Sequence, residues 1–227
     1  MTQLFRWGGA LTFLASLLSM PAMYMLRLGH PSLDDGAAAR DAGLNVMLFT
    51  IFAMHHSVMA RTGAKRWISR VVPADLERSV YVWVASLLFL AVCTLWRPLP
   101  GVVWQVHDAA WLFFIPQAVG VALTLAAARI VGIWELAGVR QPDVTRPVDF
   151  RASGPFAIVR HPIYLGWVLM LFPTPVMTTS RLLFAMISTL YLIVAIPLEE
   201  RLLVEMYGDA YRTYQRQMRW RLIPYVW

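Results

Sequence analysis

The 227-residue chain has little charge and almost none of the residues that cross-link a protein. Only 15% of its residues are charged, whereas 59% are hydrophobic, which is far from the composition of a typical soluble domain. Cys93 is the one cysteine, so an intramolecular disulfide is excluded. Lysine is nearly absent, since Lys65 is the only one among 20 basic residues, a bias found in GC-rich bacterial genomes. The composition therefore predicts an integral membrane protein.

The formal net charge of +7 does not indicate a nucleic-acid-binding protein. The basic residues lie in short loops between long apolar runs and form no continuous patch, as a nucleic-acid surface would require. We therefore expect the lipid bilayer to be the partner of these charges.

Six apolar runs predict the helices of an all-α membrane protein. About 20 apolar residues cross a bilayer as a helix, and four runs approach that length without an interior charge: Trp7–Leu28, Gly43–Met59, Ser79–Trp96 and Ala109–Ala128. The fifth, Pro162–Phe172, would span only about 17 Å before Pro173 and Pro175 break it. The sixth, Leu182–Leu198, follows almost at once. We predict five or six transmembrane helices, with the last two forming a C-terminal helical hairpin.

The loops predict the orientation in the membrane. Most basic residues fall in three of them: Arg61–Arg78, Arg129–Arg160 and Arg201–Arg221. The alternate loops carry only four, so the positive-inside rule places both termini in the cytoplasm, at a bacterial inner membrane. The connection 129–160 is long enough to act as a lid or a mobile linker.

The motif Arg160-His161-Pro162-Ile163-Tyr164-Leu165-Gly166 begins the fifth helix. Pro162 suits the first helical position, and the unpaired N–H groups of that turn would offer a site for a carboxylate. Arg160 and His161 would add charge and donors there. Gly166 would permit close approach of another backbone or a flat ligand. The alternative is a positively charged helix end that faces anionic lipid.

Two adjacent carboxylates, Glu199 and Glu200, end the sixth helix. Acidic residues at the edge of an apolar run need partners. They can accept hydrogen bonds from ribose hydroxyls or pair with a ligand ammonium, or they can be interfacial acids offset by Arg160 or Arg201. A hairpin would bring both motifs to the same membrane face.

A further segment beyond Gly208 has an amphipathic pattern. Spacings of four, three and four residues place four large side chains on one face: Tyr207, Tyr211, Tyr214 and Met218. This spacing predicts a cytoplasmic amphipathic helix that lies on the membrane or closes over the site, and its aromatic residues are expected to pack.

Two of these segments together carry a family resemblance. RHPIYLGW (160–167) and EERLLVEMYGDAYRTYQRQ (199–217) resemble the C-terminal signature of the isoprenylcysteine carboxyl methyltransferase superfamily, which phospholipid methyltransferases share in a looser form. The N-terminal half is similar to bacterial methanethiol S-methyltransferases in four segments: HHSVMAR (55–61), ERSVYVW (77–83), WRPL (96–99) and WELAGVRQ (134–141).

The composition predicts a single membrane domain over 1–227, with N-terminal transmembrane helices in 1–128. The resemblance, which runs from about residue 44 to 220, implies that this domain is a methyltransferase whose cofactor-binding part is 129–227. It implies S-adenosyl-L-methionine as the cofactor, held by six residues: Arg160, His161, Tyr164, Gly166, Glu199 and Glu200. It also implies methyl transfer to a small apolar thiol, with methanethiol giving dimethyl sulfide. A phospholipid or isoprenylcysteine-type acceptor is the alternative.

A thiol acceptor requires a base or a cation, because a simple thiol is largely protonated at neutral pH. His55 and His56 end the second helix on the predicted cytoplasmic side, about 100° apart, so only one should face the bundle. Either can act as the base, or make a structural hydrogen bond or lipid contact. Three arginines on that side can stabilise the thiolate: Arg61, Arg78 and Arg140. The competing hypothesis is that one of this pair and His161 ligate a haem; no other metal site is expected.

Overall fold

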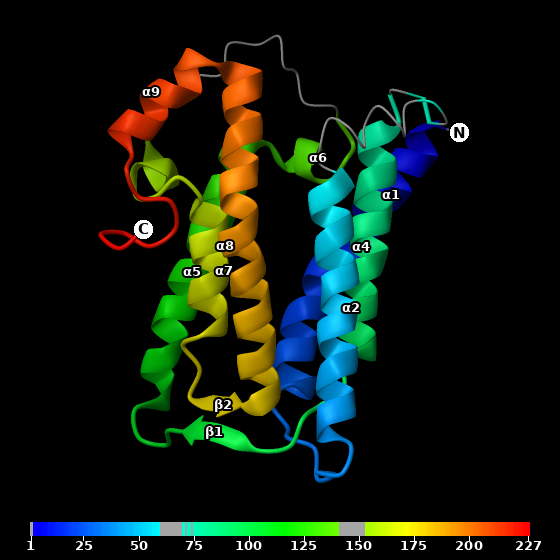
Figure 1. The fold of residues 1–227 in the computed structure, drawn as a ribbon, viewed down its shortest axis with the longest axis vertical. Helices are drawn as coiled ribbons and strands as arrows, with labels where there is room; N and C mark the ends of the chain where they lie inside the picture. The colour runs from blue at the N-terminus through cyan, green and yellow to red at the C-terminus, as the bar shows by residue number, and fades with distance from the viewer. Residues whose placement is uncertain (1, 60–69, 71, 74, 141–152) are drawn as a thin grey trace. The chain divides into compact units, whose positions relative to one another are not determined.

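A computed structural model describes residues 2–59, 70, 72–73, 75–140 and 153–227 (Figure 1). The chain divides into two compact units. Unit 1 comprises Met1–Gln105, Ile133–Gln141 and Val176–Ile187, and unit 2 comprises Val106–Gly132, Pro142–Pro175 and Ser188–Trp227. Helix α8 contributes its first residues to unit 1 and the remainder to unit 2.

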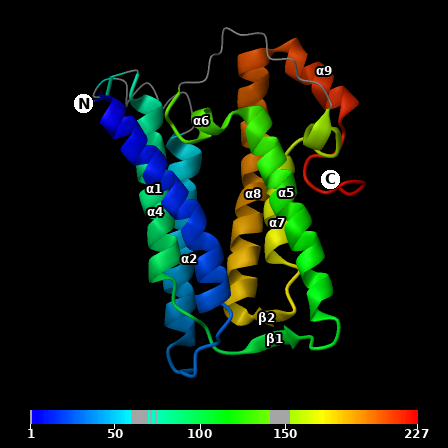
Figure 2. The same cartoon turned by 180° about the vertical axis from the view of Figure 1, so that it is seen from behind.

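The described residues of unit 1 include the α-helices α1 (Thr2–Ala22), α2 (Ala38–Met59), α4 (Glu77–Leu95) and α6 (Ile133–Leu136), a π-helical turn η1 (Met23–Arg27) that continues α1, and the start of α8. Both α1 and α2 pack along α4, and these three helices lie side by side in both views (Figures 1 and 2). Helix α4 ends where Arg97 precedes Pro98, since a residue before proline disfavours helical geometry. Trp96 is fully buried there, with its ring 5.3 Å from that of Phe184 in an edge contact.

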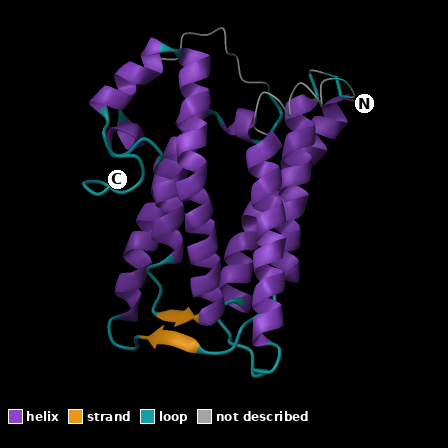
Figure 3. Cartoon of the chain, in the orientation of Figure 1, coloured by secondary structure: helices purple, strands orange, loops and turns teal. Residues whose placement is uncertain are grey.

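Two strands in unit 1 were not predicted from the sequence. Strand β1 (Val102–Gln105) pairs antiparallel with β2 (Val176–Thr178), with Val102 opposite Thr178 (Figure 3). Arg181 at the start of α8 donates from Nη1 to the carbonyl of Val176 at 2.6 Å. This short pairing joins segments more than 70 residues apart, which no local sequence pattern announces.

The described residues of unit 2 include the part of α8 (Thr179–Tyr207) from Ser188 onward, together with η2 (Ala110–Phe113), α5 (Phe114–Val131), η3 (Gly154–Ala157), α7 (Pro162–Leu171) and α9 (Asp209–Gln217). Helix α8 ends at Tyr207 because Gly208 takes a positive φ of 55°, a conformation open to glycine at little cost. The C-terminal segment folds back, so that the buried side chain of Leu222 joins Val159, Leu165 and Ile196 in one apolar cluster.

Five of the described helices are long and apolar enough to cross a membrane: Thr2–Arg27, Ala38–Met59, Glu77–Leu95, Ala110–Val131 and Thr179–Tyr207. Helix α7 is apolar but has only ten residues. These findings confirm the prediction of an all-α integral membrane protein with five or six transmembrane segments, the additional one being short.

The surroundings of α7 differ in part from the predicted hairpin. Trp167 of α7 donates from Nε1 to Ser188 Oγ of α8 at 3.0 Å, but the most extensive helix packing of α7 is against α5. The structure therefore groups α5 with the predicted cofactor-binding part, although the sequence placed it within residues 1–128. The organisation as one domain stays a prediction, and Arg61 and residues 141–152 of the predicted lid lie outside the described residues.

Candidate functional site

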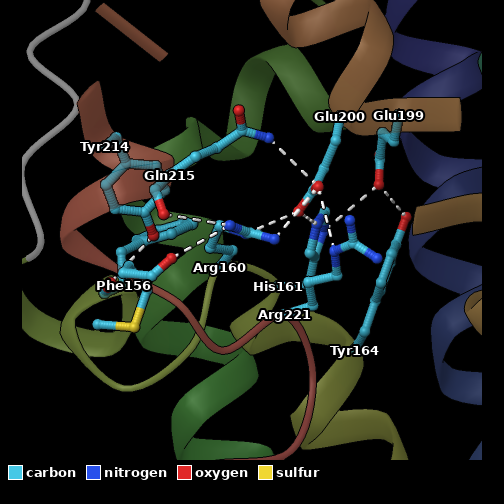
Figure 4. A network of polar contacts seen from close by, with 10 residues as sticks. Phe156, Arg160, His161, Tyr164, Glu199, Glu200, Tyr214, Gln215 and Arg221 are labelled. Carbon is cyan, nitrogen blue, oxygen red and sulfur yellow. Dashed lines mark hydrogen bonds and ion pairs between the residues drawn. The ribbon is translucent and has the colours of Figure 1, made fainter. Parts of the chain in front are cut away.

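The side chain of Glu200 is the centre of a polar network in unit 2. It is only 5% exposed. Arg160 lies beside it, with Nε 2.7 Å from Oε1 and Nη2 donating to Oε2 at 3.3 Å. The Nε2 atom of His161 is 3.2 Å from Oε1. The two motifs that the sequence paired are therefore in contact, as predicted, and Figure 4 shows these donors pointing toward the carboxylate.

Two more donors to Glu200 were missed by the sequence interpretation. Gln215 of α9 donates from Nε2 to Oε2 at 3.3 Å, and Arg221 Nε is 3.3 Å from the same oxygen. Gln215 stands within the resembling segment 199–217, for which the sequence interpretation considers only Glu199, Glu200 and the tyrosines. Arg221 lies beyond every motif, so nothing in the sequence marked it. With four side chains around it, the Glu200 carboxylate is held by charge-assisted contacts on both oxygens.

The backbone before α7 differs from the predicted anion site. The N–H of Arg160 donates to the carbonyl of Trp220 at 2.8 Å, and the N–H of His161 donates to that of Arg221 at 3.0 Å. The N–H groups of Tyr164 and Leu165 both bond to the His161 carbonyl at 3.1 Å. In this structure the carboxylate bound by the Arg160 and His161 side chains is therefore that of Glu200, and their roles toward a cofactor stay predictions.

Glu199 is in a different position from its neighbour. Its side chain is 46% exposed, yet its carboxylate is oriented, because the hydroxyl of Tyr164 donates to Oε2 at 2.9 Å. His161 Nδ1 is 3.6 Å from the same oxygen, and the His161 and Tyr164 rings stack with their centroids 5.4 Å apart. A fixed carboxylate with open surface can accept hydrogen bonds from hydroxyls or face a cation.

Both ring nitrogens of His161 are therefore directed at carboxylates. Ligation of a haem iron by this histidine would require one of these contacts to break, so the geometry gives the haem hypothesis no support.

Gly166, the last residue of the first motif, faces α5. A Cβ at this position would lie 2.6 Å from the carbonyl oxygen of Gly120 and would also collide with Thr124 Oγ1. Of the two roles foreseen for this glycine, the structure shows the close approach of another backbone. Its role in cofactor binding stays a prediction.

The aromatic face of α9 packs, as predicted. Tyr211, Tyr214 and Met218 are buried in one cluster, and the Tyr214 hydroxyl donates to the carbonyl of Phe156 at 3.0 Å. Burial raises the pKa of Tyr211, and burial also raises the pKa of Tyr214 to about 12, with a smaller contribution from the Glu200 carboxylate. Both phenols are therefore neutral at physiological pH and serve as packing groups.

Three of the residues predicted to act on the acceptor, His55, His56 and Arg78, lie together in unit 1. The hydroxyl of Tyr81 lies 2.8 Å from His56 Nδ1, and the ring of His55 stacks on that of Tyr81 at 5.9 Å. Arg78 lies over the Tyr81 ring, with Cζ 5.3 Å from its centroid, and donates from Nε to the carbonyl of Glu135 at 3.0 Å. Tyr81 had not been singled out, although it lies in the quoted segment 77–83.

Arg140 does not join this cluster. It is exposed, and its backbone N–H donates to the carbonyl of Trp134 at 3.2 Å. Within the described residues its side chain makes no hydrogen bond or ion pair. Of the two arginines predicted to stabilise a thiolate and described by the structure, only Arg78 is beside the histidines.

Comparison with known proteins gives relatives over most of the chain. Residues 114–210 match the Phospholipid methyltransferase family. Methanethiol S-methyltransferase of Mycobacterium tuberculosis is 39% identical over 86% of this chain and 84% of its own length. Methanethiol S-methyltransferase 1 of Bradyrhizobium diazoefficiens is 39% identical over 84% of this chain and 70% of its own. Nurim of Xenopus laevis is 29% identical over 66% of this chain and 58% of its own length. No solved structure matches significantly.

Proposed function

Because the chain belongs to the methanethiol S-methyltransferase family, we propose that this membrane methyltransferase converts methanethiol to dimethyl sulfide with S-adenosyl-L-methionine as the methyl donor. The observation that carries the proposal is the accessible, oriented carboxylate of Glu199 beside the buried network of Glu200. The Phospholipid methyltransferase match covers this same region.

The residues of this network fit the proposed cofactor by their chemistry. When bound, S-adenosyl-L-methionine supplies a methyl group from a positively charged sulfonium. Glu199 would accept hydrogen bonds from ribose hydroxyls or face the cationic part of the ligand. His161 and Tyr164 would orient the Glu199 carboxylate, Glu200 would fix Arg160 and His161, and Gly166 would keep α7 against α5.

The acceptor is proposed to be a small apolar thiol. Transfer from a sulfonium to a thiolate destroys two opposite charges, so a water-poor site favours it. A membrane-embedded helical protein supplies such surroundings, and a small volatile thiol can reach them from the bilayer. His56 or His55 would take the thiol proton and Arg78 or Arg140 would stabilise the thiolate.

We propose the bacterial inner membrane as the location, with both termini in the cytoplasm. Five of the described helices are long enough to cross a membrane. With the short α7 as a sixth crossing the number would be even, and the alternation of basic loops supports this orientation. We also propose a single methyltransferase domain over residues 1–227 in which 129–227 bind the cofactor. Reporter fusions after Gln105 and after Gly208 should report opposite sides of the membrane.

The decisive experiment supplies membranes that contain the protein with methyl-labelled S-adenosyl-L-methionine and methanethiol. Labelled dimethyl sulfide in the headspace is expected, and Glu199→Gln should reduce it whereas Glu205→Gln, an exposed acid of the same helix, should not. Label in the lipid fraction without volatile product would instead establish a phospholipid acceptor, which the family match at residues 114–210 makes the second candidate. A Soret band in the purified protein would establish haem binding.

A further inference from the structure

The two adjacent histidines of α2 differ in what their ring nitrogens contact. His56 is engaged, because the Tyr81 hydroxyl lies 2.8 Å from Nδ1 and 3.4 Å from Nε2. The Nδ1 atom of His55 is buried and has no hydrogen-bond partner among the residues that the structure describes. Buried polar atoms nearly always have partners, so of the two histidines His55 is the one with a ring nitrogen left to contact a ligand atom.

The surroundings of His55 suit an anion that forms beside it. The stacked Tyr81 ring limits its rotation, and the Arg78 guanidinium lies over that same ring. The described ionisable groups in this cluster are two imidazoles, one phenol and one guanidinium. Glu135 contacts Arg78 through its backbone carbonyl, and its carboxylate also interacts electrostatically with the Arg78 charge. The Arg78 guanidinium brings a positive charge to this cluster, and a positive charge favours the loss of a proton from a bound acid such as a thiol.

We infer that His55, rather than His56, is the base that takes the proton of the acceptor thiol, and that Tyr81 is a positioning residue that holds both imidazole rings. This inference rests on the proposed function. The S–H bond breaks, the proton goes to Nδ1 of His55, and the electron pair stays on sulfur. The thiolate then forms the new S–CH3 bond as the bond from that methyl to the donor sulfonium breaks, and its electrons remain on the donor sulfur. His55 later releases its proton to solvent.

Tyr81 acts through the histidines in this scheme. Its hydroxyl fixes the orientation of the His56 ring, and its ring face fixes that of His55. In this scheme His56 is part of the cluster through its contact with Tyr81 and does not take the thiol proton. Removing the hydroxyl alone separates these two contributions, since phenylalanine retains the stacked ring.

The test compares His55→Gln, His56→Gln and Tyr81→Phe, with His30→Gln as the matched control at an exposed histidine. Dimethyl sulfide formation is measured from pH 6 to 9, together with the dissociation constant of S-adenosyl-L-methionine. His55→Gln should lower kcat on the order of 100-fold at neutral pH, the usual size of a general-base contribution, and leave cofactor affinity unchanged. Its residual rate should rise with pH as the thiol ionises. His56→Gln and Tyr81→Phe should lose less than about 10-fold.

An acceptor that is already ionised separates chemistry from structure. Methaneselenol is deprotonated at neutral pH, so it should restore most of the rate to His55→Gln. Equal defects of His55→Gln with both acceptors, or a larger loss in His56→Gln than in His55→Gln, would overturn the inference. Failure of the unmodified protein to make dimethyl sulfide would instead remove the proposed function, a result that the variants cannot imitate because the unmodified protein is measured first.

Discussion

The imidazole rings of His161 in unit 2 and of His55 in unit 1 differ in the partners of their ring nitrogens. In unit 2, His161 directs one ring nitrogen at Glu200 and the other at Glu199. In unit 1, the buried Nδ1 of His55 has no hydrogen-bond partner within the described part of the chain. A ring that is held on both edges can orient its neighbours but can exchange a proton only by breaking a contact. A ring whose buried nitrogen makes no hydrogen bond can accept a proton from a ligand without first breaking a contact.

The same contrast separates the two adjacent acids of unit 2. Glu200 is buried and contacted by four side chains, whereas Glu199 is oriented by Tyr164 and remains nearly half exposed. Neighbours in sequence thus divide the work, since one fixes the network and the other offers a carboxylate to a ligand. Substitutions that act on one carboxylate at a time can break this comparison.

Removal of the Glu200 charge should have the largest effect. Glu200→Gln keeps the shape of the side chain but leaves the Arg160 guanidinium, 8% exposed, without its carboxylate. Breaking a buried pair in this way costs about 3–5 kcal/mol, which corresponds to a fall in apparent Tm of roughly 6–20 °C for a chain of this size. Thermal unfolding in detergent would measure it, with Glu205→Gln as the control on the same helix. An unchanged Tm would show that Glu200 does not hold the network together.

Glu199→Gln should act on the ligand and leave the fold intact. A hydrogen bond to a charged group contributes about 1.5–3 kcal/mol, so the affinity for S-adenosyl-L-methionine should fall by about 10- to 100-fold. The apparent Tm should stay within about 2 °C, because the side chain is largely exposed and surface changes are usually small. Calorimetric titration measures the affinity. A loss of stability with unchanged affinity would reverse the roles of the two acids.

Gly166→Ala tests whether the glycine of the first motif supports packing. The added Cβ would meet the Gly120 carbonyl at 2.6 Å, so α5 and α7 must separate, and overpacking of this kind costs about 1–3 kcal/mol. Gly43→Ala is the matched control, because a Cβ there has no atom within 4 Å and alanine favours a helix. Unfolding temperatures that fall for Gly166→Ala and hold or rise for Gly43→Ala are expected. If Gly166→Ala keeps full stability but binds the cofactor weakly, Gly166 contributes to cofactor binding and not to the packing of α5 and α7.

These contrasts also show what the sequence can and cannot predict. Hydropathy places the starts of the membrane helices within about five residues, with Trp7–Leu28 expected and Thr2–Arg27 observed, because the bilayer imposes both length and apolarity. The end of the last one is missed, since Leu182–Leu198 was expected and the helix continues to Tyr207. The contact between Arg160 and Glu200 was predictable, since the last two membrane helices run in opposite directions. The contribution of Arg221 was not, because it depends on a chain reversal after α9 that carries no repeating pattern. The different exposure of Glu199 and Glu200 depends on packing, so two adjacent glutamates in the sequence do not show which one is buried.

The smallest expected effect concerns the aromatic cluster of α9, whose Tyr214 hydroxyl, like the ring nitrogens of His161, is already engaged within unit 2. Tyr214→Phe removes the hydrogen bond to the Phe156 carbonyl and should cost about 1 kcal/mol, with exposed Tyr225→Phe as the control. Because the folded state raises the pKa of Tyr214 from its usual 10 to about 12, it favours the neutral phenol. That contribution is complete below pH 10 and is lost as the pH rises toward 12. The difference in unfolding temperature between Tyr214→Phe and the unmodified protein should therefore be the same at pH 7, 8 and 9. A difference that shrinks across this range would mean that Tyr214 ionises early and that α9 is not closed over a dry cluster.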